Sequence, residues 1–146
     1  MGKNDSISFT LPDGRVVDFD RLVEGTHSGV NGIRLTSLAE GTAEGTITIA
    51  AGQLNARGNL HGGVAATLAD AITGVGCMFL YQTTKLATAG LNIVYLRPVR
   101  EGTITATCHA LSKGRALSVW KAELTDEEGT LFAEATVTYA LLEQMG

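Results

Sequence analysis

One run of twenty residues, GGVAATLADAITGVGCMFLY at positions 62–81, constrains the fold of this chain more than any other segment. It is apolar on nearly every side of a helix, which is typical of a helix buried all round and not of one lying on a protein surface. It is also longer than most β-strands, which favours a helix over a strand. The rest of the chain must therefore supply enough structure to surround this segment.

The same run is long enough to cross a bilayer, for which about 20 residues suffice. However, Asp70 lies near its middle, where an unpaired carboxylate would be costly in lipid. The opening residues, MGKNDSISFT, lack the apolar stretch of a signal peptide. We therefore expect a buried helix, no membrane partner and a cytoplasmic protein.

Strand-like segments flank the predicted helix on both sides. Two precede it, at 30–39 and 42–50, and are joined by a turn at Glu40-Gly41. Four strand-like segments follow it, at 86–99, 102–111, 115–124 and 130–142, and the last three alternate between apolar and other residues. In the third of these the alternation changes phase between Val119 and Trp120, which indicates a β-bulge.

This order predicts an α+β fold in which an antiparallel six-stranded sheet curls around one long buried helix. With 146 residues the chain has the length of one domain, which we place at 29–146. Residues 1–28 form a polar, weakly patterned N-terminal extension that contains one candidate helix, DFDRLVEG. We expect this extension to cap either the functional pocket or an edge of the sheet.

Composition excludes several partners. A formal net charge of -4 argues against nucleic acid or an anionic membrane surface. Cys77 and Cys108 have no metal-like spacing and are expected to be buried, reduced thiols. We also interpret His27, in a glycine-rich loop, and His109, in a strand, as structural. We therefore predict neither a metal nor a cofactor.

His61 and Asp70 stand out because they are the readily titrated groups around an otherwise apolar helix. A carboxylate in such a helix must be paired, protonated or functional. Nine residues of helix separate the two side chains by about 13 Å and half a turn, so they should not touch within one chain. They can meet only across an antiparallel second copy of the helix, which predicts a symmetric homodimer with two shared sites.

Gly62 and Gly63 lie at the start of this helix, where backbone N–H groups lack partners and the helix dipole is positive. A carbonyl oxygen can approach such N–H groups closely, which is an oxyanion-hole arrangement suited to acyl transfer. Asn55, six residues before His61, adds a possible amide donor. A structural interpretation stays open, because a His-Gly-Gly triplet is common and a buried helix can hold one satisfied aspartate.

Asn55, the His61-Gly62-Gly63 triplet and Asp70 on a buried helix, with strands before and after, resemble the hotdog-fold acyl-CoA thioesterases, in particular the PaaI-like branch. The resemblance covers about residues 29–142 and includes the LNIVYLRPV strand and the KGR turn. It implies that acyl-CoA is the substrate and that coenzyme A is no separate cofactor.

The resemblance also implies residue roles. Asn55 and the Gly62 N–H would bind the thioester oxygen, while His61 would orient Asn55 or steady the departing thiolate. Asp70 of the neighbouring subunit would activate water or attack as a nucleophile. Thr88, early in the strand after the helix, would help to place the water. The substrate-binding residues are expected at Gly63, Leu68, Ile72 and Thr73 around the acyl group and at Arg97, Arg100, Lys113 and Arg115 around the nucleotide of coenzyme A.

The predicted reaction is the hydrolysis of an aryl- or medium/long-chain acyl-CoA to the free acid and coenzyme A. Two alternatives stay open: a hotdog dehydratase or hydratase, and a non-catalytic hotdog dimer that binds acyl-CoA. Members of the resembling family often pair dimers into tetramers, so a homotetramer is expected.

Overall fold

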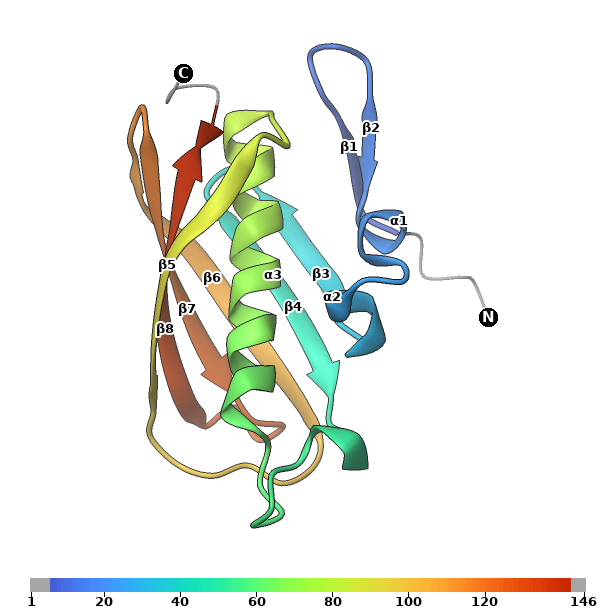
Figure 1. The fold of residues 1–146 in the computed structure, drawn as a ribbon, viewed down its shortest axis with the longest axis vertical. Helices are drawn as coiled ribbons and strands as arrows, with labels where there is room; N and C mark the ends of the chain where they lie inside the picture. The colour runs from blue at the N-terminus through green and yellow to red at the C-terminus, as the bar shows by residue number, and fades with distance from the viewer. Residues whose placement is uncertain (1–5, 143–146) are drawn as a thin grey trace.

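The computed structural model describes residues 6–142 and confirms the predicted architecture (Figure 1). A long helix, α3 (Gly62–Tyr81), packs against a six-stranded antiparallel sheet with the strand order β3-β4-β6-β7-β8-β5. The strands are β3 (Arg34–Ala39), β4 (Thr42–Thr48), β5 (Leu86–Tyr95), β6 (Thr103–Lys113), β7 (Leu117–Thr125) and β8 (Leu131–Leu141). A short 3-10 helix, η1 (Ala51–Gln53), follows β4.

Two strands are shorter by four residues than the sequence pattern predicted. β3 begins at Arg34 and not at residue 30, because Val30 ends a helix and Gly32 turns the chain with a φ of 71°. β5 ends at Tyr95, short of the predicted residue 99, because the pairing of β5 with β8 stops there and Pro98 has no N–H to donate to a sheet.

The predicted bulge is present, but its extra residue belongs to the neighbouring strand. Ala110 of β6 pairs with Trp120 and Ser112 pairs with Val119, which leaves Leu111 unpaired. The change of phase in β7 therefore indicates the position of the bulge along the strand pair. The sequence of β7 alone could not show which of the two strands carries the additional residue.

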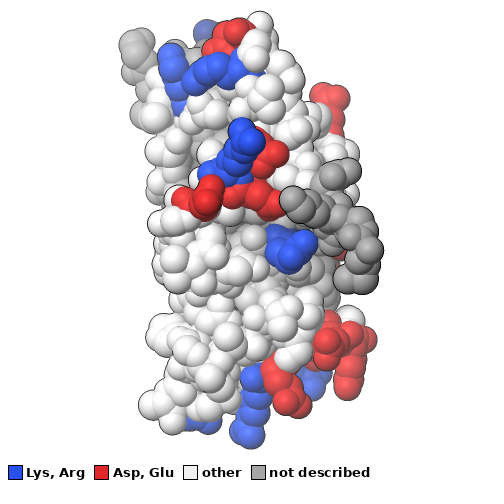
Figure 2. All heavy atoms as spheres, turned by 90° about the vertical axis from the view of Figure 1, so that its right-hand side faces the viewer, with Lys and Arg blue, Asp and Glu red and all other residues white. Residues whose placement is uncertain are grey.

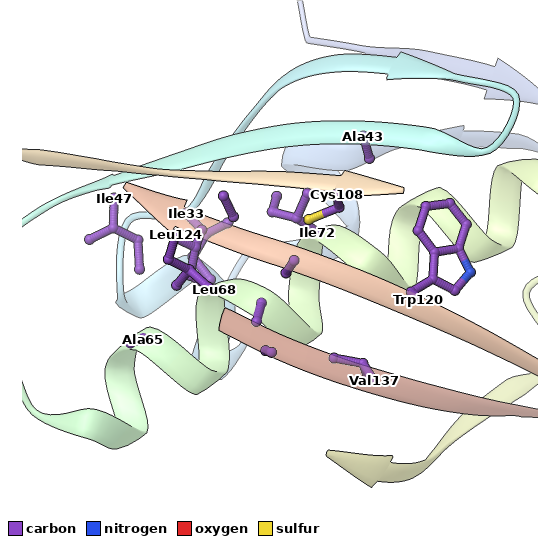
Figure 3. Packing of buried hydrophobic residues seen from close by; sticks show 14 of the residues in the cluster. Ile33, Ala43, Ile47, Ala65, Leu68, Ile72, Cys108, Trp120, Leu124 and Val137 are labelled. Atoms are coloured by element: carbon purple, nitrogen blue, oxygen red, sulfur yellow. The ribbon is translucent and has the colours of Figure 1, made fainter. Parts of the chain in front are cut away.

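The core lies between the concave face of the sheet and α3 (Figure 3). Leu68 and Ile72 of α3 are fully buried against it, as is Trp120 of β7. Helix and sheet approach closely at Gly76, where a Cβ atom would lie 2.8 Å from the Trp120 ring. Glycine at this position therefore leaves room for the large indole beside the helix.

β5 is an edge strand with little cover. It pairs with β8 on one side only, and most of its residues are exposed. Apolar side chains are among them, since Leu91 is 38% exposed and Val94 55% exposed. An edge strand of this kind offers unpaired backbone donors and acceptors to another chain.

The N-terminal segment forms small elements that lie along the side of α3 away from β5 (Figure 1). These are the hairpin strands β1 (Ser8–Thr10) and β2 (Val16–Asp18) and the helices α1 (Phe19–Val23) and α2 (His27–Val30). α1 is the helix predicted in DFDRLVEG, whereas the hairpin was not predicted because its strands are only three residues long. On the face shown in Figure 2, acidic and basic side chains are intermixed and form no continuous patch of one sign.

Candidate active site

His61 is the N-cap of α3, and its ring is held by the helix that it caps. The Gly63 N–H donates to Nδ1 of His61 at 2.9 Å. A neutral His61 ring with an accepting Nδ1 carries its proton on Nε2, so the exposed side of the ring is a donor. We expected the Gly63 N–H to face the substrate, but the structure places it in this hydrogen bond to His61.

The Gly62 N–H is the helix-tip amide left for a ligand, since within residues 6–142 it donates to no protein acceptor. Its neighbourhood is fixed by Tyr95, whose hydroxyl donates to the Gly62 carbonyl oxygen. A Cβ atom at position 62 would lie 2.8 Å from the Tyr95 Oη, which explains the glycine. Tyr95 ends β5, so one end of that edge strand is attached to the helix tip. The alternation of β5 gave no sign of this contact.

Asn55 is oriented by the turn that it opens. Its Oδ1 accepts from the Arg57 N–H at 2.9 Å and from the Asn59 N–H at 3.2 Å. Because both donors occupy the oxygen, the amide nitrogen of Asn55 is the end available to a substrate. Asn55 and Gly62 line one cavity of about 520 Å³ at the tip of α3. No hydrogen bond joins His61 to Asn55 in the described part of the chain, so the orienting contacts come from the turn and not from the histidine.

Asp70 lies in a cluster of three hydroxyl groups. Its Oδ1 accepts from Thr88 Oγ1 at 2.8 Å and from Tyr139 Oη at 2.9 Å. The Tyr139 oxygen also lies 2.6 Å from the Asp70 carbonyl oxygen and 2.7 Å from Thr73 Oγ1. Oδ1 thus accepts from Thr88 and shares the single proton of Tyr139 with the Asp70 carbonyl oxygen, whereas Oδ2 has no hydrogen bond to residues 6–142. Oδ2 is therefore the oxygen available for chemistry.

Tyr139 keeps its proton in this cluster. The side chain is buried, with 2% exposure, and burial together with the charge of Asp70 raises the pKa of Tyr139 far above its usual value. Tyr139 therefore acts as a donor to its carboxylate neighbour over the whole physiological pH range. The sequence did not single out Tyr139, because it is 69 residues from Asp70 and its place in the alternation of β8 is that of an ordinary core residue.

The two groups of residues form two separate half-sites within one chain. Gly62 and Asp70 line different cavities, and eight residues of continuous helix place them about 12 Å apart along the axis of α3. The separation of His61 from Asp70 expected from the helix spacing is thus present. Each half-site holds one part of the predicted chemistry.

The expected acyl-pocket residues are divided by the direction in which they face. Leu68 and Ile72 are fully buried against the sheet and line neither of these cavities. Thr73 is buried in the cluster around Asp70, where its hydroxyl contacts Tyr139. The cavity beside Asp70 is lined instead by the next face of the helix, with Ala71, Gly74, Val75 and Met78. Helix phase explains this difference, since a shift of one residue rotates a side chain by about 100°.

The basic residues also fall into two groups. Arg97 lines the cavity at the helix tip, and Arg100 donates to Asn59 Oδ1 at 3.0 Å beside it. Arg57, which was not singled out in the sequence, lines the same cavity. These three arginines can contact an anionic ligand that enters at this end.

Lys113 and Arg115 lie at the opposite end of α3. The ammonium of Lys113 sits 5.6 Å from the centre of the Tyr81 ring, and Tyr81 is the last residue of the helix. A helix of 20 residues is about 30 Å long, so these two residues cannot join the arginines around one small group in the same chain.

The remaining histidines and cysteines have structural surroundings. His27 begins α2, where the sequence predicted a loop, and its Nε2 lies 3.0 Å from Thr67 Oγ1 of α3. His109 is exposed on β6. Cys77 and Cys108 are free and buried, and burial raises the pKa of Cys108 to about 12. Residues 6–142 contain no group of three or more His, Cys, Asp or Glu side chains arranged to hold a metal ion.

Comparison with known proteins identifies the family to which this fold belongs. Residues 57–133 match the family model of the thioesterase superfamily. Human acyl-coenzyme A thioesterase 13 is 32% identical over 108 residues, which cover 73% of this chain and 77% of the relative. A thioesterase from Haemophilus influenzae has a similar structure, with 26% identity, 92% coverage of both chains and a TM-score of 0.80. The PaaI protein of the Escherichia coli phenylacetic acid degradation operon is 26% identical, with a TM-score of 0.75 over 83% of this chain and 88% of that one.

A sheet wrapped around a single helix with a glycine-lined tip and a carboxylate defines an enzyme of the thioester hydrolase class with the hotdog fold. The chain belongs to the thioesterase superfamily and is a PaaI-like hotdog thioesterase. The resemblance inferred from Asn55, the His-Gly-Gly triplet and Asp70 is thereby confirmed at the level of the family.

Proposed function

We propose that this enzyme hydrolyses acyl-CoA thioesters, of aryl or medium/long-chain acids, to the free acid and coenzyme A at two sites shared across a homodimer. The name of the human relative supports the substrate class. A relative from Escherichia coli is named a medium/long-chain acyl-CoA thioesterase, which supports an apolar acyl group.

The observation that carries the shared site is the position of both half-sites along β5. Thr88, near the start of this strand, contacts Asp70, and Tyr95, at its end, contacts Gly62. If two β5 edges pair antiparallel about a twofold axis between residues 91 and 92, position 88 of one chain lies opposite position 95 of the other. The same pairing covers the exposed Leu91 and Val94. The carboxylate of one chain then faces the helix tip of its partner.

Each half-site supplies a different part of the reaction. The Gly62 N–H and the amide nitrogen of Asn55 donate to the thioester oxygen, where negative charge develops as the carbonyl carbon becomes tetrahedral. The positive end of the α3 dipole favours the same charge. The donors are held in advance by the turn at Asn55 and by Tyr95, so little reorganisation is needed during the reaction.

Asp70 acts through Oδ2 on the opposite side of the carbonyl. Acting as a general base, it takes a proton from a water molecule that Thr88 helps to place, the water oxygen bonds to the carbonyl carbon, and the carbon–sulfur bond breaks. Acting as a nucleophile, Oδ2 bonds to that carbon first, and water then hydrolyses the resulting anhydride. In both cases the coenzyme A thiolate leaves and is steadied by the Nε2–H of His61.

A panel of aryl- and straight-chain acyl-CoAs, with free thiol as the readout, tests this proposal. We expect wild-type protein to release thiol and Asp70→Asn to lose at least a hundredfold in kcat. Thiol release that survives Asp70→Asn unchanged would exclude the assigned role of Asp70. Tight binding without release would favour the acyl-CoA-binding alternative, and addition of water to an enoyl-CoA would favour the hydratase. Single-turnover hydrolysis in ¹⁸O-labelled water tests the nucleophile, because water that attacks the Asp70 carbonyl carbon of the anhydride labels Asp70 and leaves unlabelled Asp70 oxygen in the first acid released.

A further inference from the structure

The second cavity joins the reactive carboxylate to the N-terminal segment. It has a volume of about 260 Å³, and Asp70 and Thr88 lie on its wall. One long side is α3, and the other is formed by α1 and the start of α2, with Phe19, Leu22 and Val23 among the lining residues. A group bonded to the carbonyl carbon that Asp70 attacks would therefore enter this cavity.

The cavity is elongated along the helix. Asp70, Gly74 and Met78 line it at intervals of four residues, which is a straight row on one face of α3. From Asp70 to Met78 this row extends about 12 Å. Gly74, at its centre, has no side chain to interrupt the space. An extended covalent chain advances about 3.5 Å for every three bonds, so roughly ten atoms in a row span that length.

The lining is mostly apolar and carries one charge, which is at the reactive end. Besides the aromatic residues Phe19 and Tyr139, its apolar side chains are aliphatic, namely those of Leu22, Val23, Ala71, Val75, Met78, Leu86 and Ala87, while Asp70 is the single charged residue. Leucine and methionine side chains adapt to a flexible chain, whereas a planar ring would fill only part of a 12 Å space. The cavity therefore suits an unbranched alkyl group.

The wall formed by α1 is held in place at both ends. The Phe9 ring of β1 packs edge-on against Phe79 of α3, with 5.2 Å between ring centres. At the other end, His27 Nε2 of α2 lies 3.0 Å from Thr67 Oγ1 of α3. α1 bridges these two attachments and places Leu22, 40% exposed, as the outer boundary of the cavity.

We propose that this cavity between α1 and α3 holds the acyl chain, that its occupant is an unbranched alkyl group of about eight to twelve carbons, and that Leu22 and Val23 limit its length. This inference rests on the proposed thioesterase activity, and it gives the N-terminal segment the role of setting specificity.

The test is a chain-length series from acetyl-CoA to palmitoyl-CoA, together with phenylacetyl-CoA. Each buried methylene is worth about fourfold in binding, so kcat/KM should rise by up to about fourfold per carbon and level off or fall beyond about twelve carbons. Leu22→Trp fills the outer end of the cavity. If the new indole displaces two methylenes of the decanoyl chain, the ratio of decanoyl to butanoyl kcat/KM should fall by at least tenfold. Val23→Ala should move the optimum to longer chains, and this change keeps the inference testable if Leu22→Trp does not fold.

Val16→Trp is the matched control, because it places the same indole side chain at an exposed position of the N-terminal segment that does not line this cavity. It should leave the decanoyl-to-butanoyl ratio at the wild-type value. Hydrolysis with no dependence on chain length, a preference for phenylacetyl-CoA over decanoyl-CoA, or an equal effect of Leu22→Trp and Val16→Trp would overturn the inference while leaving the thioesterase proposal intact. Absence of thiol release from every substrate would instead contradict the proposed function itself.

Discussion

Replacing Tyr139 with phenylalanine removes one hydroxyl group from the cluster that holds Asp70. Oδ1 of Asp70 then keeps a single donor, Thr88 at 2.8 Å, instead of two. The phenylalanine ring fills the same buried space, so no cavity is created. Thr73 keeps its hydrogen bond to the Ala69 carbonyl oxygen at 2.7 Å. The change therefore removes the contacts of the phenol with the Asp70 carboxylate, the Asp70 carbonyl oxygen and Thr73, without changing the packing around them.

The magnitude follows from the kind of bond lost. A hydrogen bond to a charged group contributes about 1.5–3 kcal/mol, and we expect Tyr139→Phe to lower the free energy of unfolding by roughly 2 kcal/mol. A carboxylate that is free to shift by about 1 Å loses up to about a hundredfold in rate. We therefore expect kcat to fall about 10- to 100-fold while KM changes less than threefold, because Tyr139 does not line the coenzyme A end of the site.

Ser118→Ala is the matched control for this prediction. The Ser118 hydroxyl is equally buried, donates to the Ser112 carbonyl oxygen and accepts from the Trp120 indole N–H, with both contacts at 3.0 Å. Its loss should destabilise the protein by a similar amount without lowering kcat. Steady-state kinetics and urea unfolding of both variants decide the matter. If Tyr139→Phe retains wild-type kcat, or if Ser118→Ala loses as much, the positioning role of Tyr139 is refuted.

Three further predictions concern the dimer, the helix tip and the core. Mixed dimers of Asp70→Ala and His61→Ala should regain about one working site, measured as thiol release after subunit exchange; no recovery in proven heterodimers would contradict the shared site. Gly62→Ala should lower kcat/KM at least tenfold because its methyl group meets Tyr95, and adding Tyr95→Ala should restore part of the activity if that contact is the cause. The raised pKa of Cys108, about 12 against a usual 9, stabilises the fold below pH 9, and this stabilisation is lost as pH rises from 9 towards 12. Relative to a Cys108→Val variant, the wild type should therefore lose roughly 1 kcal/mol of unfolding free energy between pH 8 and pH 10 in urea titrations, and equal pH dependence of the two proteins would count against the shift.

The long helix was the most predictable element because its signal is local. The apolar run gives its length, His61 precedes it as a cap, and α3 has the bounds that the pattern predicted. Strand ends were less predictable, since they depend on where a neighbour stops pairing, as at Tyr95. The bulge was located in the correct place, but assigning its extra residue to β6 needed the register of two strands.

The placement of the candidate site residues was predictable only where neighbours in sequence are neighbours in space. Asn55, His61 and Gly62 lie within eight positions, and one turn and one helix start bring them together. Tyr139 is the opposite case: it reaches Asp70 because α3 packs across β8, and it lies beside Thr88 because β8 pairs with β5, and no local pattern encodes either arrangement.

The Asp70 carboxylate and Gly62 are contacted from opposite ends of the exposed strand β5, by Thr88 and Tyr95. This placement bears on how the enzyme responds when the protein is diluted. Under the shared site that we propose, a solitary subunit would carry every reacting group and could not bring them to the same carbonyl. The specific activity of such an enzyme would depend on its own concentration, and it would fall when subunits separate even if each stays folded. Under the same proposal, any agent that covers β5 would inhibit the enzyme without approaching the substrate.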